Sequence, residues 1–235
     1  MKSIKLGLRQ IIYENKAFRR NPVSAFFTFI LPLLFLFILN IVLGNNTLES
    51  SKGIINLSTM YIPTMAAFSI INSAYTSIAM NLSLSRDRGL LKRIQSTPLP
   101  KSSFMLGKIA HNILISATLV LIIIIAGEFI FDVRVPRSNI PALFIVLILG
   151  TATFCSLGIA ITSLIPNADA SPAIVNASIL PLLFISEIFI PMNNAPNWIN
   201  LVAQIFPVRP LSTSLQEIYN PSASGLGINI IDLLV

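Results

Sequence analysis

Mostly apolar runs alternate with short polar stretches along nearly the whole chain. A helix needs about 20 residues to cross the hydrocarbon core of a bilayer. Five runs reach that length, at about 23–43, 59–84, 104–131, 140–165 and 171–190. A sixth run, 226–235, provides only ten residues. The pattern predicts an all-α, polytopic membrane protein with six spans, of which the last is incomplete, as in a fragment of a longer chain.

Two basic segments show the spacing of amphipathic helices. Residues 1–22 combine six Lys and Arg residues with apolar residues at helical spacing, which predicts a helix lying in the membrane interface. A signal peptide is the competing interpretation, but the apolar run that follows is too long and lacks a small-residue cleavage site. Residues 86–97 predict a second, shorter helix, which Pro98 ends. Its apolar stripe consists of Leu90, Leu91 and Ile94.

Composition and charge define the class of protein and its orientation. Hydrophobic residues make up 54% of the chain and charged residues 11%, against roughly 25% charged in soluble domains. The net charge of +7 lies mainly in loops beside spans, so it indicates membrane topology and not nucleic-acid binding. Of the 16 Lys and Arg residues, 12 lie in 1–22 and 86–108, and four lie in 44–58, 132–139 and 191–225. The positive-inside rule therefore places the N-terminus and residues 86–108 on the cytoplasmic side of a plasma membrane.

The second expected span is uncharged but rich in small polar side chains. Such groups are costly against lipid, so they should face other helices or a water-lined path, and both interpretations stay open. A path of this polarity beside aromatic residues suits an amphiphilic drug or lipid as cargo, and a polysaccharide or a peptide stays open as an alternative. The candidate path residues are Ser69, Asn72, Ser73 and Thr76. In the third span, Lys108 lies near the cytoplasmic end, from which its side chain can extend to the headgroups.

The order of residues in 86–99 resembles a motif of a known family. The chain reads Arg-Asp-Arg-Gly-Leu-Leu, then Lys-Arg-Ile and Thr-Pro-Leu. In ABC-2 type transporter permeases, the multidrug-resistance-like subunits, the loop after the second span typically reads Arg-Glu-Arg-Gly-Thr-Leu, then Arg-Leu and Thr-Pro-Leu. The chain departs from this order at Asp87 and Leu90. Phe-Ile-Pro at 189–191 and Pro-Asn-Trp at 196–198 resemble the end of the fifth span in the same family.

The resemblance implies a six-span ABC-2 bundle of the type V exporter kind. Residues 191–225 would form an external re-entrant hairpin, and 86–97 would be a coupling helix that docks on a separate ATP-binding subunit. The implied assembly holds two permease subunits, as a homodimer or heterodimer, and two ATP-binding subunits that use ATP and Mg²⁺. This assembly would be surrounded by membrane lipid and would export cargo across the bilayer. The implied coupling residues are Arg86, Asp87, Arg88, Gly89, Leu90, Leu91, Arg93, Ile94, Thr97 and Pro98.

Known catalytic motifs do not occur in the sequence. It has no Gly-x-x-x-x-Gly-Lys-Ser/Thr phosphate loop, no Gly-x-Ser-x-Gly elbow and no His-Glu-x-x-His helix, which predicts a transport subunit without ATPase activity or a bound cofactor of its own. The single histidine, His111, excludes a multi-histidine metal site. A membrane enzyme would need His111 with an acid, but the acids in the apolar runs lie about a full span away.

Acidic residues in or near the spans are candidates for two roles, proton coupling in an alternative function and an outer gate. A proton-coupled secondary transporter could use Glu128, Glu187 or Asp232, because ionisable groups within membranes are functional candidates by default. Glu187 is also the candidate for an outer gate, together with Pro191 and Trp198. An interfacial acid hydrated among headgroups is the competing interpretation of Glu187.

Overall fold

Helices account for most of the architecture. The computed structural model describes residues 2–43, 47–50, 53–97, 99–133, 139–186, 188–189, 199, 203 and 206–219. In chain order the helices are α1 (Lys2–Arg19), α2 (Pro22–Leu43), α3 (Leu57–Ile71), the π-helix η1 (Asn72–Thr76), α4 (Ser77–Asp87), α5 (Leu90–Gln95), α6 (Lys101–Phe131), α7 (Ile140–Ile161), α8 (Ser171–Ile185) and α10 (Val208–Tyr219). The expected helical architecture is confirmed for this part of the chain.

A short β-hairpin between α2 and α3 is an element that the sequence analysis did not predict. Its strands β1 (Thr47–Ser50) and β2 (Gly53–Asn56) pair antiparallel, with Thr47 opposite Asn56. Two strands alone are marginally stable in water. This hairpin is anchored to α3, because β2 ends directly before α3 begins and β2 contacts α3.

Three helices are long and apolar enough to cross a membrane individually: α2 over Pro22–Val42, α6 and α7. The apolar helix α8 has 15 residues, fewer than the expected span of 171–190. The expected second span corresponds to α3, η1 and α4, which follow one another without a gap over 57–87. Ile71 and Ser77, on either side of η1, are both right-handed helical, so the chain stays helical throughout. Residues 226–235 lie outside the described residues.

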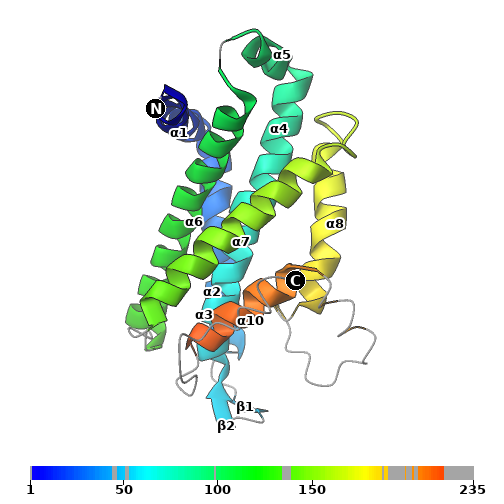
Figure 1. Cartoon of the computed structure of the whole chain (residues 1–235). Coiled ribbons are helices and arrows are strands. Elements are labelled where there is room, and N and C mark those ends of the chain that lie inside the picture. Colours follow the sequence, from blue (N-terminus) through cyan, green and yellow to red (C-terminus); the bar gives the residue numbers. More distant parts are fainter. Residues whose placement is uncertain are drawn as a thin grey trace.

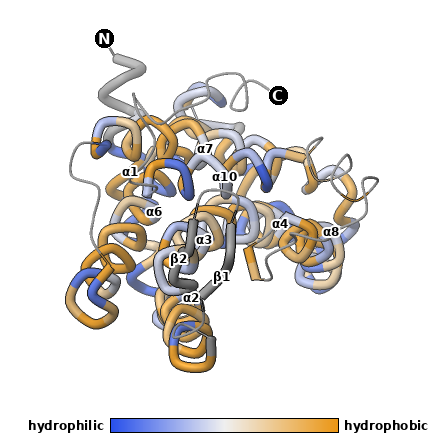
Figure 2. Tube along the Cα trace, turned by 90° about the horizontal axis from the view of Figure 1, so that it is seen from below, coloured by the Kyte–Doolittle hydropathy of each residue, from blue (hydrophilic) through white to orange (hydrophobic). Residues whose placement is uncertain are grey.

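The two ends of the bundle carry different elements (Figure 1). Helices α1 and α5 lie at one end, and the β-hairpin and α10 lie at the other. Seen along the bundle in Figure 2, the long helices are coloured mainly as hydrophobic, and α2 lies at the edge. Only 17% of the apolar window of α2 is buried, and Phe26, Phe27 and Leu34 are exposed on it. This surface is suited to contact with lipid.

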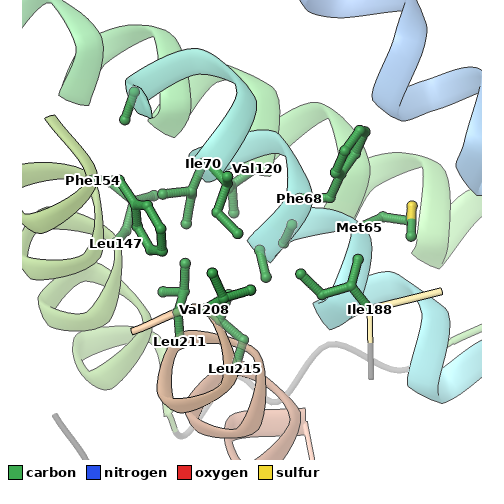
Figure 3. Packing of buried hydrophobic residues seen from close by; sticks show 14 of the residues in the cluster. Met65, Phe68, Ile70, Val120, Leu147, Phe154, Ile188, Val208, Leu211 and Leu215 are labelled. Carbon is green, nitrogen blue, oxygen red and sulfur yellow. The ribbon is translucent and has the colours of Figure 1, made fainter. Parts of the chain in front are cut away.

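The core is centred on α3 and closed by α10. Met65 and Ile70 of α3 are fully buried. Figure 3 shows Val208, Leu211 and Leu215 of α10 directed into the same cluster. The apolar side of α10 is therefore packed into the bundle and not spread on its surface. Within lipid, such contacts stabilise through close packing more than through the hydrophobic effect.

Candidate functional site

The chain reverses direction at Gly89, at the α5 end of the bundle. Gly89 has a φ of 69°, in the left-handed region that residues with a side chain adopt only at a cost. It separates α4 from the six-residue helix α5. The single helix expected over 86–97 is therefore two pieces, and Arg86 and Asp87 belong to the last turn of α4. The left-handed backbone at Gly89 is the physical reason for this difference.

Helix α5 is joined to α6 by a short connection. The Thr97 backbone N–H and hydroxyl both donate to the Ile94 carbonyl, at 3.0 and 2.6 Å, at the end of α5. Pro100 is extended, with ψ of 136°, and directly precedes the first residue of α6, Lys101.

Arg86 and Asp87 bind the turn between α7 and α8. Arg86 Nη1 donates to the Thr162 carbonyl oxygen at 3.0 Å, and Nη2 donates to the Ile165 carbonyl oxygen. The Ala168 backbone N–H donates to Asp87 Oδ2. Thr162 lies at the C-terminus of α7, the negative end of the helix dipole, so an arginine there is favourable. We call these three hydrogen bonds the clasp.

Because the clasp engages Arg86 and Asp87, the surface left for a partner is smaller than the docking surface that the family resemblance implies. The side chains of Arg86 and Asp87, which the family resemblance assigns to docking, are engaged within the chain. Leu90 is 40% exposed, and Leu91 and Ile94 are partly buried. The exposed cations of this segment are Arg88, Lys92 and Arg93. The exposed surface therefore combines positive charge with an apolar stripe.

Replacing Arg86 with Ala should destabilise the contact between α4 and the α7–α8 turn. The change removes two charge-assisted hydrogen bonds, which are worth about 1.5–3 kcal/mol each when buried. Because this side chain is 39% exposed, we expect a total loss of about 1 kcal/mol. Thermal unfolding in detergent measures it, with Arg93→Ala, also a loss of one exposed cation, as the matched control. Equal melting of the two variants would show that the clasp adds nothing measurable.

Two of the four candidate path residues are buried between helices. Ser69 donates to a backbone carbonyl one turn earlier at 2.8 Å, and Ser73 Oγ lies 2.7 Å from Ser116 Oγ of α6. Neither Ser69 nor Ser73 is more than 1% exposed. Their geometry fits helix packing, whereas Asn72 and Thr76 are partly exposed and stay available to line a path.

The π-helix η1 contacts both α7 and α8. Such turns are rare and often lie at functional sites. A Cβ atom added at Gly158 of α7 would lie 2.8 Å from the Tyr75 carbonyl oxygen, so a larger residue would push the two helices apart. The Tyr75 hydroxyl is hydrogen-bonded to Ser178 Oγ of α8 at 2.6 Å.

An apolar cavity of about 330 Å³ lies between η1, α7, α8 and the start of α10. Phe154, Leu157 and Ile179 contribute to its walls. Tyr75 and Ser178 supply hydroxyl groups at the same wall. Ligand pockets are usually mostly apolar, with a few polar groups that orient the ligand. This cavity therefore has the composition expected for the apolar part of an amphiphilic molecule.

A largely buried ion pair joins α1 to α6. Lys108 Nζ lies 2.9 Å from Glu14 Oε1 and 3.0 Å from Oε2, and the two side chains are 11% and 18% exposed. Gln10 Nε2 also donates to Glu14 Oε1, at 3.0 Å. The ammonium of Lys108, which the sequence suggests can extend to the headgroups, is paired with Glu14 of α1. Sequence reasoning missed Glu14, whose available signal was that it is the single acid in 1–22.

His111 lies one turn along α6 from Lys108. It is 7% exposed, and its ring packs on Phe18 of α1 with the ring centroids 5.8 Å apart. The acid Glu14, which is paired with Lys108, lies near His111. The sequence analysis had placed the candidate acids of a membrane enzyme about a full span away from His111. In the described part of the chain, no group of three or more His, Cys, Asp or Glu side chains could hold a metal ion.

Several predicted site residues lie outside the described residues. They are Pro98, Glu187, Pro191, Trp198 and Asp232. Of the expected hairpin 191–225, the structure describes Ile199, Ala203 and 206–219, which include α10. The outer gate therefore stays a prediction.

Comparison with known sequences decides the family. The chain matches the ABC-2 type transporter family over residues 10–219. It belongs to that family. Together with its apolar helices, this makes the ABC-2 chain a multi-pass membrane protein.

Three relatives of this ABC-2 chain carry permease names. The probable doxorubicin resistance ABC transporter permease protein DrrC of Mycobacterium tuberculosis is 28% identical, and the match covers 77% of this chain and 64% of DrrC. The putative transport permease YvfS of Bacillus subtilis is 21% identical over 85% of this chain and 79% of YvfS. The probable multidrug ABC transporter permease YbhS of Escherichia coli is 24% identical over 65% of this chain and 41% of YbhS. This chain thus spans a little under two thirds of the length of DrrC.

Proposed function

We propose that this chain is the permease subunit of an ABC exporter, driven by ATP hydrolysis in a separate ATP-binding subunit. One observation carries the proposal: α5 presents exposed cations and an apolar stripe at one end of the bundle, between helices that are built to span a membrane. Short amphipathic helices of this kind dock in apolar grooves of partner proteins. Family membership and the permease names of the relatives support the same conclusion.

The proposed assembly has two permease copies, identical or different, and two ATP-binding subunits. The ATP-binding subunits hold ATP and Mg²⁺, and the permease binds neither and catalyses no reaction. Its six spans would be α2, the continuous helix over 57–87, α6, α7, α8 with the residues that follow it, and a last span from about 226. Residues 191–225 would form the external hairpin, to which α10 contributes.

The proposed cargo is an amphiphilic drug, lipid or similar molecule that leaves the cell. The apolar cavity beside Tyr75 and Ser178 suits its apolar part, and Asn72 and Thr76 lie on the same helical stretch. The names of DrrC and YbhS refer to doxorubicin resistance and multidrug transport in those proteins. Glu187 would act at the outer gate.

Proton-coupled transport is the alternative function. Its described candidate, Glu128, lies in the last turn of α6, far from the middle of that helix. No observation on the described residues favours this alternative over an ATP-driven exporter.

Orientation can be tested by labelling a single cysteine. In a background with Cys155→Ala, which removes the buried natural thiol, we expect Asn46→Cys to react with a membrane-impermeant maleimide in intact cells. Ser96→Cys, at the α5 end, should react only after permeabilisation, because the basic loops belong in the cytoplasm. The reverse pattern would overturn the orientation and with it the docking of α5 on a cytoplasmic ATPase.

The function itself is tested by co-expressing the permease with candidate ATP-binding subunits, starting with one encoded by a neighbouring reading frame. We expect an ATPase to co-purify, and its activity in proteoliposomes to rise with at least one amphiphile in a panel of drugs and lipids. Transport by the permease alone in response to a proton gradient, without ATP, would instead establish the secondary-transporter alternative.

A further inference from the structure

A polar cavity of about 150 Å³ lies where α1, α2, α4 and α6 meet. It is separate from the apolar cavity beside η1. In liquid water a molecule occupies about 30 Å³, so the space can hold several waters or a small polar group. Side chains from all four helices line it, among them Glu14, Phe18, Ser24, Asn81, Lys108 and His111.

His111 is the first indication of a ligand in this cavity. Its side chain lines the space and is 7% exposed, and the described protein groups provide no hydrogen-bond partner for either ring nitrogen. A neutral imidazole carries one donor and one acceptor, and buried polar groups are normally paired. The His111 nitrogens are not among the fully enclosed unpaired atoms of the described residues, so they open onto the cavity and can bind what it contains.

Hydrogen-bond donors and nearby exposed cations favour an anion in the cavity. Glu14 and Lys108 are paired with each other, and Gln10 also donates to Glu14, so together they add no net charge to the lining. The Lys108 ammonium has three N–H groups, of which the two contacts to Glu14 use two. It also lies over the Phe104 ring, 5.2 Å from the centroid, and in the proposed site the third N–H donates to the ligand. Asn21 and Ser24 line the cavity at the N-terminus of α2, the positive end of the helix dipole, where Asn21 Oδ1 accepts the Ser24 backbone N–H. Exposed cations lie in the last turn of α1 and directly after it: Lys16, Arg19 and Arg20.

The depth of the cavity identifies the anion. The 22 residues of α2, which are uncharged throughout, begin at the cavity, and α6 continues without a charge from Asn112 to Gly127. The cavity therefore lies at the edge of the hydrocarbon core, beside the interfacial helix α1. At this level the abundant anionic group is the phosphate of phospholipid headgroups.

We infer that this cavity binds the phosphate of a phospholipid from the leaflet beside α1. His111 and Lys108 donate to the phosphate oxygens, and the acyl chains lie along the exposed apolar surface of α2. The bound lipid completes the contact between the α1–α6 pair and α4, which face one another across the cavity. The inference does not depend on the exporter function.

Lipid retention by the purified full-length chain tests this site. Delipidated protein in detergent is titrated with phosphatidylglycerol, and the first tightly bound lipid is measured by native mass spectrometry. His111→Leu and Asn81→Leu remove polar groups from opposite walls of the cavity. Thr118→Val, on the exposed side of α6, is the matched control. We expect His111→Leu to weaken the first lipid by about tenfold, the effect of one charge-assisted hydrogen bond. Asn81→Leu should weaken it less, because the Asn81 amide donates to Ser77 within α4, and the control should bind like the wild type.

Two competition experiments show whether the bound phosphate belongs to a lipid or to a soluble anion. Diacylglycerol, which lacks the phosphate, should not compete for the first site, and inorganic phosphate should not displace the lipid at equal concentration. Competition by diacylglycerol, or equal retention in all variants, would reduce the binding to ordinary annular lipid and overturn the inference. Displacement by inorganic phosphate would assign the cavity to a soluble anion, and no retained lipid would leave it to water.

Discussion

Replacing Lys108 with Met is expected to release α1 from α6 and to destabilise the protein by about 3 kcal/mol. The change leaves the Glu14 carboxylate largely buried, at 18% side-chain exposure, without its cation. Removing one partner of a buried ion pair typically costs about 3–5 kcal/mol, and the partial exposure of Glu14 places the effect at the lower end. Gln10 would remain as a hydrogen-bond donor but supplies no charge.

The double variant Glu14→Leu/Lys108→Met separates loss of charge balance from loss of packing. Since both charges disappear together, it should recover most of the stability lost in Lys108→Met. Thermal unfolding in detergent measures the energy, and trypsin cleavage at Arg19 and Arg20 reports whether α1 has detached. Lys101→Met, on the exposed first residue of α6, is the control and should behave like the wild type. If the double variant is as unstable as the single one, the side chains act through packing and the charge argument fails.

The spans formed by α2, α6 and α7 could be predicted from the sequence because each is a local property of the chain. An uncharged run such as 140–165 has one stable state in a bilayer, a helix whose backbone groups are satisfied internally. The same reasoning does not foresee η1, because a π-turn in the middle of 57–87 depends on which helix approaches it. Gly158 lies 82 residues beyond Thr76 in the chain and yet packs directly against this turn.

Side-chain roles at the α5 end were predictable only in part. The motif from Arg86 to Thr97 identified the family and located the loop, but it did not show which side chains face inward. Arg86 and Asp87 stabilise the α7–α8 turn through contacts with residues more than 70 positions away. Such long-range pairs leave no periodic signal in the sequence. Glu14 was missed for the same reason, since its partner Lys108 lies 94 positions further along the chain.

The double substitution Leu91→Asp/Ile94→Asp is expected to abolish docking of the ATP-binding subunit while the permease still inserts. Both side chains lie on α5, outside the buried core, and are only partly covered within the chain. In the proposed complex they enter an apolar groove, where each contributes roughly 1.5–3 kcal/mol. Burying the new carboxylates adds a further penalty. A loss of 3 kcal/mol alone lowers affinity by more than about 100-fold.

A charge-matched control separates the loss of apolar anchors from the change in electrostatics. Ser96→Asp/Ser102→Asp adds the same two negative charges at exposed positions near α5 but leaves Leu91 and Ile94 in place. It should weaken docking only through partial neutralisation of Arg88, Lys92 and Arg93, an effect that declines with added salt. Co-purification of the ATPase and ATP-driven transport are measured for both variants at low and high salt.

The pattern of results assigns a role to α5. Salt-independent loss of docking in Leu91→Asp/Ile94→Asp, with salt-dependent weakening in the control, is the result expected of a helix that inserts an apolar stripe and steers with its cations. Equal, salt-dependent loss in both variants would mean that charge alone makes the contact. Normal co-purification and transport by Leu91→Asp/Ile94→Asp would leave α5 as a loop helix on the lipid surface, and the partner would have to engage another part of this end, such as the α7–α8 turn that the clasp fixes beside it.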